Sequence, residues 1–139
     1  MQNSMRRLSW AEFDQAIEWI TDRYVDHSFT GVYGVPRGGL CLGLALSHSL
    51  HIPLLMEPKE GCLVVDDVYE TGQTLTAVRD QVNSICVVWV SKSPPTWWDA
   101  ATTVVSEEWL LFPWENAELA GADEREYQSS RSIKKLNLL

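Results

Sequence analysis

The sequence lacks several features that define special classes of protein. It has three cysteines, Cys41, Cys62 and Cys86, without C-x-x-C spacing. A disulfide framework or a thiolate metal site is therefore not expected, and free buried thiols in a reducing compartment fit better. No apolar run approaches the roughly 20 residues that a membrane-spanning helix needs, and no apolar segment of a secretory signal follows the charged start of the chain. We expect a cytoplasmic protein with no membrane partner.

Basic residues are also few, and this bears on the partners of the protein. Lys and Arg total 11 against 19 Asp and Glu, for a net charge of −8. Binding to a nucleic-acid backbone requires a basic surface, so we expect no nucleic-acid partner. The 139 residues suit one domain with one core. We expect that core over about residues 28–115, followed by a tail, 116–139. The tail is either a helix packed on the surface or a disordered end, and we favour partial order.

Hydrophobic periodicity predicts alternating helices and strands. A capping box at Ser9, followed by apolar residues at spacings of three and four, predicts a helix of about 15 residues from Trp10. Two more helices are expected over Leu40–Leu50 and Thr74–Val82, and strands over Gly31–Val35, Ile52–Met56, Gly61–Val65, Ile85–Val90, Ala101–Val105 and Trp109–Phe112. This alternation predicts an α/β fold with an open, mainly parallel sheet flanked by helices.

One run of the sequence carries most of the chemistry. A strand ending at Val65 leads into Asp66 and Asp67, and Glu70 follows just before a polar turn made of Thr71, Gly72, Gln73 and Thr74. Carboxylates suit ribose hydroxyls or a hard metal ion, and the amides at a helix N-terminus suit a phosphate. Two acids after a strand, taken alone, also fit a simple helix cap. Together with the turn, they predict a site for ribose 5-phosphate.

A second loop adds groups that suit phosphate. Arg37, Gly38 and Gly39 follow the strand that ends near Val35 and precede an expected helix. Glycines allow close approach to a ligand, and arginine matches phosphate oxygens, although most Gly-Gly turns are only turns. In open α/β sheets, ligands bind at the carboxyl ends of the strands. Both loops should therefore line one crevice.

The sequence resembles the type I phosphoribosyltransferases in four features. These are the Asp66–Thr74 run, the Pro36–Gly39 loop, Lys92 after a strand, and Trp109 before a Pro-Trp-acid segment. The closest resemblance is to the bacterial xanthine–guanine and hypoxanthine enzymes. It implies the fold of that family with a small C-terminal hood. It also implies transfer of the phosphoribosyl group of phosphoribosyl pyrophosphate (PRPP) to a base, a 6-oxopurine, with release of pyrophosphate. A non-proline cis peptide between Pro36 and Arg37 is expected as well.

The resemblance also implies roles for single residues. Arg37, Gly38 and Gly39 would bind pyrophosphate, and Thr71, Gly72, Gln73 and Thr74 would bind the 5′-phosphate. Asp66 and Asp67 would receive the ribose hydroxyls, partly through Mg²⁺, and Glu70 would hold the N7 proton of the base. Lys92, Trp109 and Leu110 would bind the base. For Lys92 a solvated position in a loop is an equally good interpretation, and for Trp109 packing in the core is. The implied partners are PRPP, a nucleobase or nucleoside monophosphate, and further copies of the chain.

The sequence departs from the family between Leu50 and Gly61. Relatives usually have a longer excursion there, with a flexible loop that closes over PRPP, whereas only His51–Glu60 are available here. Lids exclude water and complete a site. Three hypotheses follow: a compact purine phosphoribosyltransferase, a catalytically weak or inactive PRPP- or nucleotide-binding regulatory module, or an enzyme with another acceptor base.

Overall fold

The computed structural model describes residues 5–119, and these residues form two compact units. The large unit is Ala11–Ser106. The small unit consists of the described parts of residues 1–10 and 107–139. The expectation of one domain over the whole chain stays a prediction, and of the tail from 116 only the first few residues lie in the described part.

A five-stranded, fully parallel sheet forms the centre of the large unit. Its strand order is β3-β2-β4-β5-β6. The strands are β2 (Val32–Gly34), β3 (Leu54–Leu55), β4 (Cys62–Tyr69), β5 (Ser84–Ser91) and β6 (Asp99–Thr103). Parallel strands need crossover connections, and helices supply two of them, between β2 and β3 and between β4 and β5. The expected α/β class is thereby confirmed.

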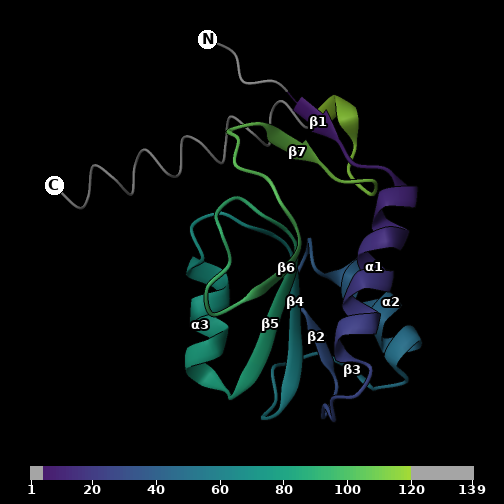
Figure 1. Cartoon of the computed structure of the whole chain (residues 1–139), viewed down its shortest axis with the longest axis vertical. Helices are drawn as coiled ribbons and strands as arrows, with labels where there is room; N and C mark the ends of the chain where they lie inside the picture. The colour runs from purple at the N-terminus through teal and green to yellow at the C-terminus, as the bar shows by residue number, and fades with distance from the viewer. Residues whose placement is uncertain (1–4, 120–139) are drawn as a thin grey trace, which may run out of the picture. The chain divides into compact units, whose positions relative to one another are not determined.

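Helices cover both faces of this sheet. The helices are α1 (Trp10–Tyr24), α2 (Leu40–Leu50) and α3 (Gln73–Gln81). In Figure 1, α3 lies on one side of the sheet, and α1 and α2 lie on the other. The bounds of α1 and α2 confirm the expected helices, because amphipathic spacing and the flanking turns determine both locally. α3 begins one residue earlier than expected.

The core consists of two layers, one on each face of the two central strands. Toward α3, Trp98 packs in a buried cluster with Val64, Val78 and Val88. On the other face, the ring of Phe13 in α1 meets Trp89 of β5 edge-on, with centroids 5.7 Å apart. Each fully buried side chain of this size contributes about 1.5–3 kcal/mol to stability. This double burial explains why β4 and β5 are continuous apolar runs.

Two strands, β4 and β3, differ most in length from the expectation. β4 was expected to end at Val65, yet it continues through the acids to Tyr69, because its pairing with β5 continues to the pair Tyr69–Ser91. β3 is only two residues long, at the edge of the sheet. The expected strand around Pro53 is thus mostly irregular, since proline has no N–H to donate to a ladder.

The small unit contains a strand that was not anticipated. β1 (Met5–Arg7) pairs in parallel with β7 (Trp109–Leu111), and the Leu8 amide donates to the Leu111 carbonyl at 2.8 Å. β7 confirms the extended segment expected over Trp109–Phe112. Trp114 stacks on Phe112 with centroids 5.3 Å apart. The expected C-terminal hood therefore corresponds to a unit that also uses N-terminal residues.

Candidate active site

The carboxyl ends of β2, β4 and β5 carry most of the residues singled out in the sequence. Asp66 and Asp67 lie within β4, where Asp66 pairs with Val88 of β5. The acids therefore sit on a rigid strand and not in the loop after it, which corrects the expected boundary. Strands hold side chains more precisely than loops do.

The loop after β2 is tied to β4 through its backbone. The Val35 amide donates to the Val65 carbonyl at 2.9 Å, and the Gly39 amide donates back to the Val35 carbonyl at 2.7 Å. The peptide between Pro36 and Arg37 is cis, which confirms the expectation. Arg37 is exposed, so its guanidinium is accessible to a ligand.

Gly38 brings this loop against the acids. A side chain at Gly38 would overlap the carboxylate of Asp67, so only glycine fits without a shift. The loop after β2 and the acidic part of β4 are therefore in direct contact.

The two adjacent carboxyl groups of β4 are largely buried. Burial and repulsion by Asp67 raise the pKa of Asp66 well above its usual range, and burial raises the pKa of Asp67. Each accepts one backbone amide, from Asp67 and Val68 respectively, at 2.8 Å. No cationic side chain among the described residues contributes to either shift. Such a pair favours a ligand that brings positive charge or hydroxyl donors.

The turn after β4 depends on Gly72. This residue precedes α3 with φ of 76°, in the left-handed region, and a side chain there would meet the hydroxyl of Tyr69. No side-chain hydrogen bond caps α3 at Gly72, and the first turn holds no acid. Thr71, Gln73 and Thr74 are exposed around this turn. The N-terminus of α3 thus presents positive dipole charge without a competing carboxylate.

The lysine expected at the base site lies beside the acidic strand. Tyr69 and Ser91 are register partners, so Glu70 and Lys92 follow paired positions of neighbouring strands. The Lys92 amide donates to the Tyr69 carbonyl at 2.9 Å. Glu70 and Lys92 are both half-buried. The parallel register therefore places Glu70 and Lys92 near Asp66 and Asp67, at the carboxyl ends of β4 and β5.

The remaining two residues expected at the base site belong to the small unit. Trp109 is half-buried in β7, and Leu110 is buried. The other expected site residues all lie in the large unit. The base-binding role of Trp109 and Leu110 stays a prediction.

Two aromatic residues that the sequence interpretation passed over support this site. Tyr69 stacks on Trp98, with ring centroids 3.7 Å apart and planes 11° apart. The indole N–H of Trp98 donates to the Ser91 hydroxyl at 3.1 Å. Their signal in the sequence is a Trp-Trp pair in the loop after β5 and an aromatic residue beside the acids. Neither shows its partner without the fold.

No three His, Cys, Asp or Glu residues in the described part gather as a metal site. A cation bound at Asp66 and Asp67 would thus take further ligands from water or substrate. In the same part of the chain, every helix is too short or too polar to span a bilayer.

Comparisons with known proteins agree with this geometry, although no family model matches the chain. A xanthine-guanine phosphoribosyltransferase of Chromohalobacter salexigens is 25% identical over 133 residues, which cover 78% of this chain and 82% of that protein. Another from Desulfotalea psychrophila is 25% identical, covering 85% of this chain and 94% of that protein. The solved purine phosphoribosyltransferase from Pyrococcus horikoshii has a TM-score of 0.66 and 23% identity, covering 81% of this chain and 95% of that one.

Proposed function

We propose that this chain, which belongs to the type I phosphoribosyltransferase family close to the bacterial purine enzymes, transfers the 5-phosphoribosyl group of PRPP to a 6-oxopurine in the cytoplasm. The observation that carries the proposal is the contact between Gly38 and the carboxylate of Asp67. It joins a loop suited to pyrophosphate with acids suited to ribose. PRPP is a substrate that carries a pyrophosphate and a ribose hydroxyl on adjacent carbon atoms.

The reaction needs positioning more than covalent chemistry. A ring nitrogen of the base displaces pyrophosphate from C1′, through a transition state with positive charge on the ribose ring. Asp66 and Asp67 hold the ribose hydroxyls, and the turn at Gly72 holds the 5′-phosphate. Glu70, which follows directly after the last residue of β4, holds the N7 proton of the base while N9 attacks. Each group orients PRPP or stabilises charge as it develops.

Mg²⁺ fits the acidic pair. Burial raises the pKa of both carboxyl groups, and repulsion by Asp67 adds to the rise at Asp66, so a divalent cation would favour the ionised form of both. When bound, Mg²⁺ would supply charge neutralisation for the pyrophosphate leaving group. Since the described residues hold no third acidic, His or Cys ligand, the substrate itself would complete the coordination shell.

Lys92 supports a 6-oxopurine over adenine as acceptor. Its ammonium group can donate to an exocyclic oxygen but cannot accept from an amine. Its backbone is anchored beside Glu70, so base selection and N7 protonation would use adjacent strands. The base-binding roles of Trp109 and Leu110, which belong to the small unit, rest on the family resemblance alone.

Apolar surface on α2 and β3 supports the homo-oligomer that the family suggests. Leu40 and Leu44 on α2, and Leu54 and Met56 at the sheet edge, are all exposed. Residues 38–56 contain no Asp, Glu, Lys or Arg, so two chains of net charge −8 could meet there without repulsion. Light scattering on the purified protein tests this directly.

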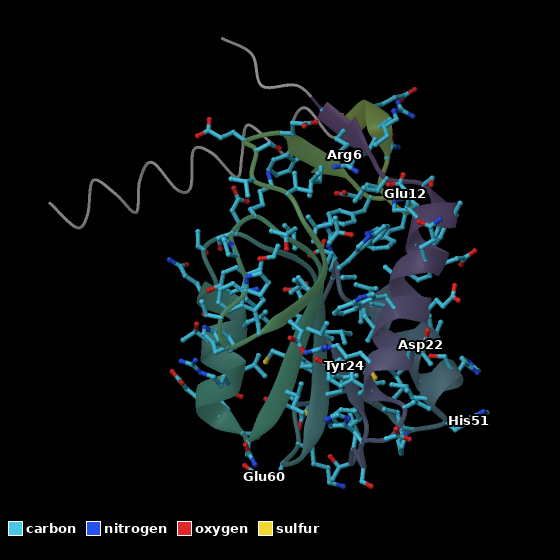
Figure 2. All side chains as sticks on the ribbon, in the orientation of Figure 1. Arg6, Glu12, Asp22, Tyr24, His51 and Glu60 are labelled. Carbon is cyan, nitrogen blue, oxygen red and sulfur yellow. The ribbon has the colours of Figure 1, made fainter. Side chains whose placement is uncertain are left out.

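A second function, nucleotide binding without turnover, is favoured by the short connection between α2 and β4. The connection starts at His51, after α2, and ends near Glu60, before β4 (Figure 2). Both ends lie at the amino edge of the parallel sheet, and only the two residues of β3 extend along the strands. This connection is too short to cover the acids, so a lid would need another source.

The test is pyrophosphate release from PRPP and Mg²⁺ with hypoxanthine, xanthine, guanine, adenine, uracil and orotate. Release with a 6-oxopurine, and none with adenine, would support the proposal. Release only with a pyrimidine would retain the enzyme and refute Lys92 as a purine selector. No release with any base, together with binding of a nucleoside monophosphate, would favour the binding module.

Glu70→Gln separates the role of Glu70 from that of its neighbours. Loss of the carboxylate should lower kcat by about 100-fold or more, because the N7 proton loses its acceptor. PRPP affinity, measured by calorimetry, should stay within about twofold, since Glu70 faces the base in this proposal. A collapse of PRPP affinity would show that Glu70 acts on the ribose or phosphate instead.

A further inference from the structure

We propose that Trp98 is a positioning residue for base recognition, which acts by fixing the short turn that carries Lys92. The inference rests on the proposed function, because it concerns how the same site selects its base. Nothing in the motif requires a tryptophan at this position. The contacts of its ring and of its indole N–H single it out.

The first link is the side chain of Ser91. Ser91 is the buried polar residue of the described core, with 0% of its surface exposed. Its hydroxyl accepts the indole N–H of Trp98 at 3.1 Å and donates to the carbonyl of Ser93 at 2.6 Å. A buried hydroxyl needs such partners, since an unpaired one costs about 1–3 kcal/mol. Trp98 therefore orients the hydroxyl that closes the turn around Lys92.

The second link holds the same turn from the other side. The Lys92 amide donates to the Tyr69 carbonyl at 2.9 Å, and the Ser91 carbonyl accepts the Val104 amide at 2.9 Å. The amide of Lys92 is thus bound to β4, and its neighbours Ser91 and Ser93 are hydrogen-bonded to each other. A long flexible side chain selects an oxygen only when its root is fixed, so this arrangement defines the reach of the ammonium group.

Tyr69 connects this turn with the phosphate turn. Its ring stacks on Trp98 at 3.7 Å, and its hydroxyl lies where a side chain on Gly72 would be. The stack supports the phosphate side, whereas the indole N–H supports the base side. Replacing Trp98 by Phe keeps an aromatic ring for Tyr69 and removes the donor to Ser91, together with part of the buried ring volume. The two supports can therefore be tested separately.

The experiment measures the KM for the base, the KM for PRPP and kcat in Trp98→Phe, Ser91→Ala and the double variant. We expect the KM for the 6-oxopurine to rise about tenfold in each single variant, while the KM for PRPP stays within about twofold. Selectivity for 6-oxopurines over adenine should fall by a similar factor. The double variant should be no worse than either single one, because both remove the same link.

Trp89→Phe is the matched control. Trp89 is also a buried tryptophan, on β5, but it faces Phe13 of α1 on the opposite side of the sheet. It should lower the melting temperature as much as Trp98→Phe and leave the KM for the base unchanged. The proposal is overturned if Trp98→Phe behaves like this control, or if the effects of Trp98→Phe and Ser91→Ala multiply in the double variant.

A binding measurement keeps this inference separate from the proposed activity. Calorimetric titration with GMP and with ribose 5-phosphate needs no turnover. Weaker GMP binding in Trp98→Phe, with unchanged ribose 5-phosphate binding, supports the positioning role even if the wild-type protein releases no pyrophosphate. Equal weakening of both ligands, or of neither, overturns it. Ser91→Ala removes only one oxygen atom and provides the same readout if Trp98→Phe does not fold.

Discussion

Acidic side chains in the large unit occur in two opposite settings. The carboxylate of Asp99 on β6 accepts hydrogen bonds from Nε of Arg23, at 2.9 Å, and from the hydroxyl of Tyr24. Tyr24, labelled in Figure 2, is the last residue of α1. Burial opposes ionisation of Asp99, but the hydrogen bonds from Arg23 and Tyr24 overcome it and lower its pKa. Asp66 and Asp67 are more deeply buried and have raised pKa values instead.

The difference indicates that Asp99 stabilises the fold, whereas Asp66 and Asp67 suit the binding of a ligand. The Asp99 contacts tie α1 to the edge strand β6 and occupy both oxygens of the carboxylate. The Asp66–Asp67 pair weakens the ligand-free fold, since burial opposes the ionisation of both carboxyl groups. Such a cost at a binding site is the usual trade between stability and function.

Asp67→Asn should have the largest effect, a loss of activity without a loss of stability. We expect kcat/KM to fall by about 100-fold or more, because a charged ligand to ribose or Mg²⁺ is lost. The free energy of unfolding should stay constant or rise by about 1 kcal/mol, since a buried charge is removed. Urea denaturation of the ligand-free protein measures this. A loss of stability of that size would place Asp67 with Asp99, as a structural acid.

Gly38→Ala tests the contact between the pyrophosphate loop and Asp67. The added methyl group would overlap the Asp67 carboxylate, so the loop must move. PRPP affinity should fall by about tenfold or more, because sub-ångström misplacement weakens several phosphate contacts together. Leu40→Ala, at the exposed start of α2, is the control and should leave PRPP affinity unchanged. Equal affinities in both variants would remove Gly38 from the site.

Asp99→Asn should affect stability and leave catalysis alone. Loss of the charged hydrogen bonds with Arg23 and Tyr24 should lower the free energy of unfolding by about 1 kcal/mol, since Arg23 is half exposed. Asp22→Asn is the control, since Asp22 lies next to Arg23 on α1 and has an exposed carboxylate. It should change stability by less than about 0.5 kcal/mol. A drop in kcat for Asp99→Asn would contradict the structural role.

The smallest effect concerns pH. The raised pKa values of Asp66 and Asp67 mean that the folded state holds a proton longer than the unfolded chain does. Stability of the ligand-free protein should therefore fall as pH rises above about 4, the unfolded value, by less than about 1 kcal/mol per pH unit. Asp99 has the opposite sign, with stability lost as pH falls below that value. The melting temperature of Asp67→Asn should depend less on pH than that of the wild type between pH 5 and 9, at about 0.1 M salt.

Local patterns determined much of the fold in advance. The helix over Leu40–Leu50 follows from an apolar run between a glycine turn and a left-handed residue, His51. The glycine turn before α3 and the cis peptide were also predicted correctly. What failed was non-local: the pairing of Met5–Arg7 with β7, and the extension of β4 through its acids, depend on partners far away in sequence.

The sequence by itself determined which chemistry is available, because residue type and spacing state which groups follow which strand. Only the tertiary structure decided how those groups behave. The pKa values of Asp66 and Asp67 rise because the fold buries them, and Gly38 is required because the fold brings its backbone against Asp67. Likewise, Trp98 reaches Ser91 because the loop after β5 returns to its own strand. Burial and distance between remote segments are properties of packing, and no local pattern encodes them.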